Sequence, residues 1–454
     1  IFGIPGEENL DIMDVLLDSD IQFILTRHEQ GAAFMADVYG RLTGKAGVCM
    51  STLGPGATNL VTGFADADMD RAPIVGIAGQ GATTRMHKES HQVLDLVDLF
   101  DPISKYSTTI RAPEVIPEVV RKAFKEAQLE KPGGSFIDFP EDIAEQELSV
   151  DKQPLKVQAP LTPVPPAEKI QQAADVISQA KYPVIMAGNG VIRNGASEAL
   201  VEFAEKLNIA VATTFMAKGV IPSSHQLSLG TIGLQAKDYV ACGFEKSDVI
   251  ICVGFDMVEF HPYIWHKYKD KKIIHIDMSP AEVAEHYILE VGVVGDIKSG
   301  LEDIARIAQP GKGEFNDQLR QTIMHELNEF ENDTSYPIKP QRIVSDVRKA
   351  LNPEDVVISD VGAHKIWMAR MYQAECPNTC IISNGFASMG IGLPGAIAAK
   401  LVNPNVTALT VTGDAGFMMN SQEIETALRI GVAIVILIWN DQEYGLIHCC
   451  LLYT

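Results

Sequence analysis

The residues best suited to chemistry lie near the end of the chain, at Asp414 and Asp441. Asp414 stands in Gly413-Asp414-Ala415-Gly416-Phe417 after the apolar run 408–412, and Asp441 follows the apolar run 434–439. A helical pattern separates the two runs, and the carboxyl ends of neighbouring parallel strands meet at one edge of a sheet. Because Mg²⁺ prefers a few carboxylates and completes its octahedron with phosphate oxygens, the spacing predicts a metal site at this edge.

The small residues after Asp414 predict a phosphate site beside that metal. Ala415 and Gly416 open a helix, where backbone N–H groups can approach an anion and the helix dipole favours negative charge. The alternative is that Asp414 only caps its helix, which is a common role for Asp. Asp414 alone favours the cap, whereas the whole unit from Asp414 to Asp441 favours a metal-diphosphate site.

The elements that must position these residues form three α/β units. Short apolar runs alternate with helical patterns, which predicts parallel sheets with helices on both faces. The expected division is a first domain at 1–148, a linker at 149–168, a central domain at 169–312, a linker region at 313–340 and a third domain at 341–454. The expected strands are 22–25, 47–51, 74–77, 135–139, 183–187, 210–213, 249–253, 272–276, 356–359, 379–383, 408–412 and 434–439, with a helix at 316–334.

Composition excludes several classes of protein. The 37 basic and 59 acidic residues give a net charge of −22, which argues against nucleic-acid and anionic-membrane surfaces. No apolar run is long enough to span a bilayer. Cys49 and Cys252 lie in apolar runs, as reduced thiols of a cytoplasmic protein would, and Cys376 and Cys380 lack the second ligand pair of a metal site.

Five segments together resemble the superfamily of thiamine-diphosphate-dependent acetohydroxyacid synthases and pyruvate oxidases. The resemblance extends over nearly the whole chain, although Leu53 stands where Ser is more usual. It implies an α/β fold of three tandem open parallel-sheet domains, which are pyrimidine-binding, central Rossmann-like and diphosphate-binding. The segments are RHEQGAAFMADVYGRLTG at 27–44, GPGATN at 54–59, DVGAHKIWMAR at 360–370, SNGFASMGIGLPGAIAA at 383–399 and the Asp414–Asp441 unit.

By this resemblance, Glu29 is the catalytic carboxylate that hydrogen-bonds the aminopyrimidine ring and activates the cofactor. Taken by itself, it is an ordinary acid at the start of a helix. Met389 would wedge beneath the cofactor and bend it, although a lone methionine is more often core filler. Ala387, Ser388 and the backbone of Met389 would meet the pyrimidine.

The resemblance also assigns the diphosphate and metal contacts. Gly362, Ala363 and His364 would touch the diphosphate, together with Ala415, Gly416 and Glu443. The Mg²⁺ ligands would be Asp414, Asp441 and the backbone carbonyl of Glu443.

The substrate is predicted from residues 87–107, which resemble a stretch of the acetolactate synthases. Gln92 would hydrogen-bond a keto acid, and Lys105 would lie near its carboxylate or shape the entry channel. The alternative is an amphipathic surface helix with a solvated lysine. The implied reaction condenses two pyruvate molecules to 2-acetolactate and releases CO₂.

The central segment 253–260 distinguishes two types of acetolactate synthase. It lacks the arginines of the flavin-binding biosynthetic type and, with Asp441 in place of the usual Asn, resembles the catabolic type, so FAD is not expected. Ala415 in place of Gly and the turn at 54–59 point the other way. The alternatives are a biosynthetic FAD-containing acetohydroxyacid synthase, a pyruvate oxidase and another carboligase.

Both ends of the sequence suggest truncation. The chain starts at Ile1-Phe2-Gly3 as if at the end of a strand, and residues 448–454 depart from the family pattern. An inactive cofactor-binding fragment is therefore the non-enzymatic alternative. In the superfamily, the glutamate-bearing domain of one subunit meets the diphosphate domain of another, which implies a homodimer at least and favours a homotetramer.

Overall fold

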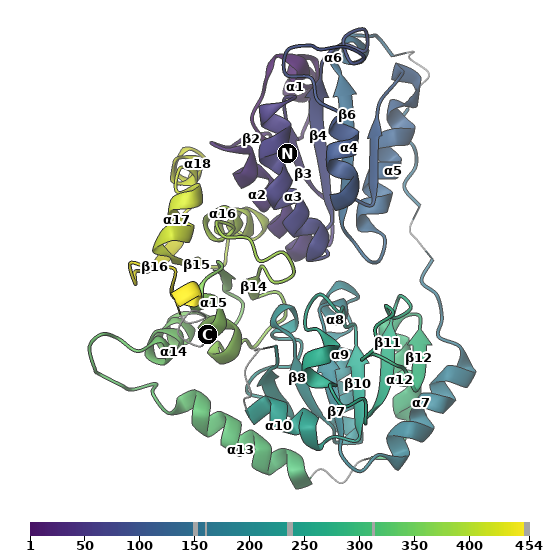
Figure 1. The fold of residues 1–454 in the computed structure, drawn as a ribbon, viewed down its shortest axis with the longest axis vertical. Helices are drawn as coiled ribbons and strands as arrows, with labels where there is room; N and C mark the ends of the chain where they lie inside the picture. Colours follow the sequence, from purple (N-terminus) through teal and green to yellow (C-terminus); the bar gives the residue numbers. More distant parts are fainter. Residues whose placement is uncertain (149–152, 159–160, 234–238, 311–313, 449–454) are drawn as a thin grey trace. The chain divides into compact units, whose positions relative to one another are not determined.

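The computed structural model describes residues 1–148, 153–158, 161–233, 239–310 and 314–448, and it contains three parallel sheets with helices around them (Figure 1). The predicted α/β class with three tandem parallel-sheet domains is confirmed. Parts of the two predicted linkers, the end of the predicted central domain and residues 449–454 lie outside the described residues. The chain forms two compact units. The first consists of Ile1–Pro160 and Gly385–Thr454, and the second is Leu161–Asn384.

The first sheet has six strands in the order β2-β1-β3-β4-β6-β5. Its core includes three phenylalanines: the rings of Phe100 and Phe136 stack with centroids 3.8 Å apart, and Phe64 meets both edge-on. The elements are β1 (Phe2–Gly3), α1 (Leu10–Leu17), β2 (Ile24–Leu25), α2 (Glu29–Thr43), β3 (Gly47–Ser51), α3 (Pro55–Met69), β4 (Ile74–Gln80), α4 (Leu96–Phe100), β5 (Tyr106–Thr109), α5 (Ile116–Gln128), β6 (Gly134–Pro140) and α6 (Glu141–Ala144).

The alanine-rich face of α2 packs closely against α3. Ala32, Ala33 and Ala36 are fully buried, and a Cβ atom on Gly63 would lie only 2.7 Å from the Cβ of Ala33. Small residues on both helices therefore bring their backbones together, and this fixes the start of α2 relative to the start of α3.

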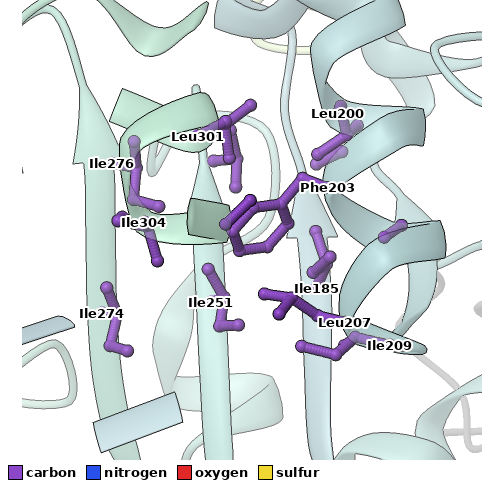
Figure 2. Packing of buried hydrophobic residues seen from close by; sticks show 14 of the residues in the cluster. Ile185, Leu200, Phe203, Leu207, Ile209, Ile251, Ile274, Ile276, Leu301 and Ile304 are labelled. Carbon is purple, nitrogen blue, oxygen red and sulfur yellow. The ribbon is translucent and has the colours of Figure 1, made fainter. Parts of the chain in front are cut away.

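The second sheet also has six strands, in the order β12-β11-β10-β7-β8-β9. Figure 2 shows the ring of Phe203 between α9 and the strands, beside Ile185, Ile251 and Ile304. The elements are α7 (Ala167–Gln179), β7 (Pro183–Ala187), α8 (Gly190–Arg193), α9 (Ser197–Leu207), β8 (Ala210–Thr213), β9 (Ser228–Thr231), α10 (Tyr239–Lys246), β10 (Val249–Val253), α11 (Pro262–Trp265), β11 (Lys272–Asp277), β12 (Val291–Val294) and α12 (Ile297–Ile307).

The third sheet has four parallel strands, with β13 paired to β14 and β15 paired to β16. Its elements and the helix before it are α13 (Glu314–Asn328), α14 (Pro340–Ala350), β13 (Val356–Ser359), α15 (Ala363–Met371), β14 (Cys380–Ile382), α16 (Gly392–Val402), β15 (Ala408–Gly413), α17 (Asp414–Asn420), α18 (Glu423–Arg429) and β16 (Val435–Trp439).

All twelve predicted strands are present, within a few residues of their expected bounds. Three strands that the sequence did not reveal, β5, β9 and β12, all lie at sheet edges. An edge strand has a neighbour on one side only, so it needs no continuous apolar run. The predicted helix 316–334 begins earlier and ends at Asn328, and residues 87–95 form no helix. Over the described residues, no helix has the length and apolar character of a membrane span.

Candidate active site

Glu29 is the first residue of α2 and is 8% exposed. The side-chain amide of Asn59 donates a hydrogen bond of 2.9 Å to its Oε2 atom. A Cβ atom on Gly56 would lie 3.4 Å from the other carboxylate oxygen, so the backbone of the glycine turn passes close to Glu29. The structure thus brings together the predicted catalytic acid and the 54–59 turn at the carboxyl edge of the first sheet.

The loop before Glu29 is held by a second buried acid, Glu423 of α18. Its carboxylate accepts hydrogen bonds from the backbone N–H groups of Arg27 and His28, each at 3.0 Å, and from the hydroxyl of Thr426. Burial raises the pKa of Glu423, although these donors act in the opposite direction. Glu423 fixes the backbone that presents Glu29.

Gln92 lies beside the same glycine turn. A Cβ atom on Gly54 would lie 2.7 Å from the carbonyl oxygen of Gln92. Both residues have positive φ angles, 51° at Gly54 and 58° at Gln92, so two tight backbone conformations meet here. The predicted substrate residue and the turn next to Glu29 are therefore neighbours.

Lys105 lies elsewhere. It precedes β5, and its Nζ atom donates a hydrogen bond of 2.7 Å to the carbonyl of Leu129. Its backbone N–H bonds to Gly134, the first residue of β6, which places it at the amino edge of the sheet that carries Glu29 at its carboxyl edge. Burial lowers the pKa of Lys105. Within one chain the structure does not bring Lys105 to Glu29, and its role with the substrate stays a prediction.

The turn that contains Ala387, Ser388 and Met389 has a demanding backbone. Ala387 has φ of 56°, in the left-handed region that non-glycine residues rarely adopt. Ser388 is buried and Met389 is half-buried. The side chain of Asn420, at the end of α17, donates a hydrogen bond of 2.9 Å to the carbonyl of Gly390. This ties the turn to the helix that begins at Asp414.

Asp414 and the loop with Asp441 also lie together. Asp414 is the first residue of α17, which Gly413 precedes as N-cap. Its Oδ1 accepts from the N–H of Ala415 at 2.7 Å, and its Oδ2 accepts from the N–H of Gln442 at 3.1 Å. Asp441 accepts from the N–H of Glu443 at 3.3 Å. The two residues therefore lie at one edge of the sheet, as predicted, and their role as metal ligands stays a prediction.

Gly362, Ala363 and His364 stand at the start of α15, directly after the strand β13. Gly362 precedes the helix, and a Cβ atom there would lie 2.8 Å from the ring of His364, which is itself buried. These residues belong to the compact unit Leu161–Asn384, so their contact with a diphosphate stays a prediction.

The sequence did not single out four residues that shape this site: Glu423, Asp66, Asp70 and Arg41. Their only local signal is a charged residue on an otherwise apolar helix face. Asp66 lies on α3 and Asp70 directly follows it as C-cap, and both are fully buried. A buried acid requires partners: Arg41 bonds both acids, and their other partners, Gly385 and Ser388, lie more than 300 residues away along the chain.

Known family models cover three successive parts of the chain. Three family models match in order: the thiamine pyrophosphate enzyme N-terminal TPP binding domain at residues 1–99, the central domain at 170–304 and the C-terminal TPP binding domain at 360–449.

Curated relatives match over almost the entire chain. A probable acetolactate synthase large subunit of Methanocaldococcus jannaschii is 38% identical over 99% of this chain and 78% of that protein. An acetolactate synthase of Bacillus subtilis is 35% identical over 98% and 79%, and a catabolic acetolactate synthase of Raoultella terrigena is 34% identical over 98% and 81%. The chain therefore belongs to the thiamine pyrophosphate enzymes, as a member of their acetolactate synthase family.

Proposed function

We propose that this protein condenses two pyruvate molecules to 2-acetolactate with release of CO₂, using thiamine diphosphate and Mg²⁺ and no flavin. The observation that carries the proposal is Glu29, a buried acid at the carboxyl edge of the first sheet. The Asn59 amide bonds its carboxylate, and the Glu423 carboxylate bonds the backbone of the preceding loop. An acid placed in this way can hold and return a proton at a fixed position.

The residues present fit the cofactor and its metal. Asp414 and Asp441 supply two hard oxygen ligands, and the small residues Ala415 and Gly416 leave room for a diphosphate. Over the part of the chain that the structure describes, no three or more His, Cys, Asp or Glu side chains are grouped to hold a metal by themselves. The ion would therefore need the carbonyl of Glu443 and the phosphate oxygens.

In this proposal the side chains of the protein position the cofactor and the substrate, exchange a proton with the cofactor and exclude water. Thiamine diphosphate, when bound, supplies the nucleophilic carbon and the electron sink that decarboxylation requires. With the cofactor bound, Glu29 would hold a proton for the aminopyrimidine, the 385–390 turn with Met389 would hold that ring, and Gln92 would orient the keto acid. Gly362, Ala363 and His364 complete the diphosphate contacts. Water is kept out so that the second pyruvate reacts before a proton does.

The absence of flavin is supported by the carboxyl edge of the central sheet, where α/β folds bind nucleotides. Here the carboxylate of Glu259, 6% exposed, accepts hydrogen bonds from the N–H groups of Asn189 and Asp256, each at 3.1 Å, and from the hydroxyl of Thr214. Arg193 forms an ion pair with Asp256. These side chains and backbone groups already occupy this edge and bond one another, which supports the catabolic type without flavin.

The proposed assembly is a homodimer or a homotetramer, since the family builds its site from two subunits. Analytical ultracentrifugation distinguishes these from a monomer. The thiols of Cys49 and Cys252 are free and buried, which favours a reducing cytoplasmic location.

The decisive experiment is pyruvate turnover by the purified protein with thiamine diphosphate and Mg²⁺, with and without FAD. Acetolactate is followed by its acid conversion to acetoin. Equal rates with and without FAD are expected. A strict requirement for FAD would indicate the biosynthetic type, and acetyl phosphate or acetaldehyde in place of acetolactate would refute the proposed reaction.

A further inference from the structure

A buried charge cluster lies between α2 and α3. The guanidinium of Arg41 donates to Asp37 at 2.7 Å and to Asp66 and Asp70 at 3.0 Å each. The three carboxylates are fully buried, and the arginine side chain is 7% exposed. Burial alone would lower the pKa of Arg41, but the three carboxylates together raise it above its ordinary value. One cation thus anchors three acids in the interior of the first compact unit.

The three acids use their oxygens differently. Asp37 directs both oxygens to Arg41. Asp70 directs one oxygen to Arg41 and accepts with the other a hydrogen bond of 2.6 Å from the backbone N–H of Gly385. Asp66 does the same with the N–H of Ser388, at 3.3 Å. The cluster therefore presents two fixed acceptors to the 385–390 turn, and charged acceptors form the stronger class of hydrogen bond.

This turn needs such support. Ala387, between the two bonded residues, holds the left-handed φ of 56°. A non-glycine residue persists in that conformation only when its surroundings determine it, and such strain is common at ligand sites. Asn420 holds the far end of the turn at Gly390. Asp66 and Asp70 hold the near end, on either side of Ala387.

We propose that Asp66 and Asp70, anchored by Arg41, are positioning residues that fix the 385–390 turn in the conformation that receives the aminopyrimidine of thiamine diphosphate. This inference rests on the cofactor role proposed above for Ala387, Ser388 and Met389. It assigns to the first domain a part in shaping the cofactor site on its own chain, apart from the role of Glu29.

The cluster supplies its own matched control. Asp70→Asn and Asp66→Asn each weaken an acceptor of the turn, whereas Asp37→Asn removes a carboxylate from the same arginine without touching the turn. For each variant we would measure the thermal unfolding midpoint and, by titration calorimetry with Mg²⁺ present, the dissociation constant of thiamine diphosphate.

Asp70→Asn and Asp66→Asn are expected to weaken thiamine diphosphate binding at least tenfold, and Asp37→Asn less than threefold, with comparable losses in the unfolding midpoint. Equal weakening by all three variants would mean that the cluster is only structural and would overturn the proposal, as would unchanged binding in Asp70→Asn and Asp66→Asn. Wild type that binds the cofactor but forms no acetolactate would refute the reaction and leave this inference standing.

If the variants do not fold, a measurement on the wild type tests whether the carboxylates hold the 385–390 turn. Amide hydrogen exchange without cofactor should be slower at Gly385 and Ser388 than at Phe386 and Ala387, whose N–H groups have no acceptor among the residues that the structure describes. Rapid exchange at all four amides would show that the carboxylates do not hold the turn.

Discussion

The first and central sheets have the same architecture but different carboxyl edges. Both have six parallel strands. At the first, Glu29 receives one side-chain hydrogen bond, from Asn59, and glycine backbone lies against it. At the central sheet, Glu259 receives two backbone N–H groups and a hydroxyl, and Gly188, Gly190 and Gly254 bring the backbone together. Both sheets have a carboxyl edge at which this fold can bind a ligand. At the central sheet, Glu259 and its three donors occupy that edge, which we call the filled edge.

The largest expected effect is at the first edge. Glu29→Gln keeps the size of the side chain and its bond to Asn59 but cannot exchange a proton, so kcat should fall by about 10²- to 10⁴-fold. Glu118→Gln, which removes an exposed acid of the same domain, is the control and should leave kcat unchanged. Steady-state acetolactate formation measures both. A loss of less than about tenfold in Glu29→Gln would remove Glu29 from the proton transfer.

The central domain should matter for stability rather than for chemistry. Phe203 of α9 is 1% exposed within the core of Figure 2, so Phe203→Ala should cost about 3–5 kcal/mol of unfolding free energy. Urea denaturation followed by fluorescence measures this loss. At a temperature where the variant is folded, kcat should stay within about twofold of wild type, a change well under 1 kcal/mol in the barrier. A large loss of kcat in folded protein would show that the central domain takes part in the reaction.

The proposed metal ligands provide a comparison within the third domain. Asp441→Asn keeps an oxygen ligand and introduces the residue that is usual in the superfamily, so the Mg²⁺ concentration for half-maximal activity should rise by less than about tenfold. Asp441→Ala removes the ligand and should raise it considerably more. A titration of activity with Mg²⁺ compares the two variants. Equal effects would indicate that Asp441 acts through the fold of its loop and not through the metal.

Sequence reasoning located elements and individual acids better than long-range partners. Glu29 and Asp414 follow strands with continuous apolar runs, and both begin helices as expected. Glu423 was not predicted, because its partners are backbone N–H groups some 395 residues earlier, and an N–H group has no sequence signature. For the same reason, the hydrogen bonds that Asp66 and Asp70 accept from the 385–390 turn were not predicted. The positions of the candidate residues on their helices and strands could thus be predicted from residue type and pattern, whereas the tertiary contacts around them could not.

A pH-dependent effect on stability is expected at the filled edge of the central sheet. Burial, with Asp256 nearby, raises the pKa of Glu259 to about 8 from an ordinary value of 4.5. Between these values the folded protein holds a proton that the unfolded chain releases, so folding stability should fall as the pH rises from about 5 to about 8, by at most about 1.4 kcal/mol per pH unit. Glu259→Gln mimics the protonated acid and removes this contribution.

Thermal unfolding midpoints of wild type and Glu259→Gln should therefore agree most closely near pH 5 and separate by pH 8, with the variant the more stable. Glu202→Gln, which removes an exposed acid on α9, should follow wild type throughout. A constant difference between wild type and Glu259→Gln across this range would show that Glu259 is ionised in the folded protein at pH 5. The contrast between the two sheets would then rest on their hydrogen-bond donors alone.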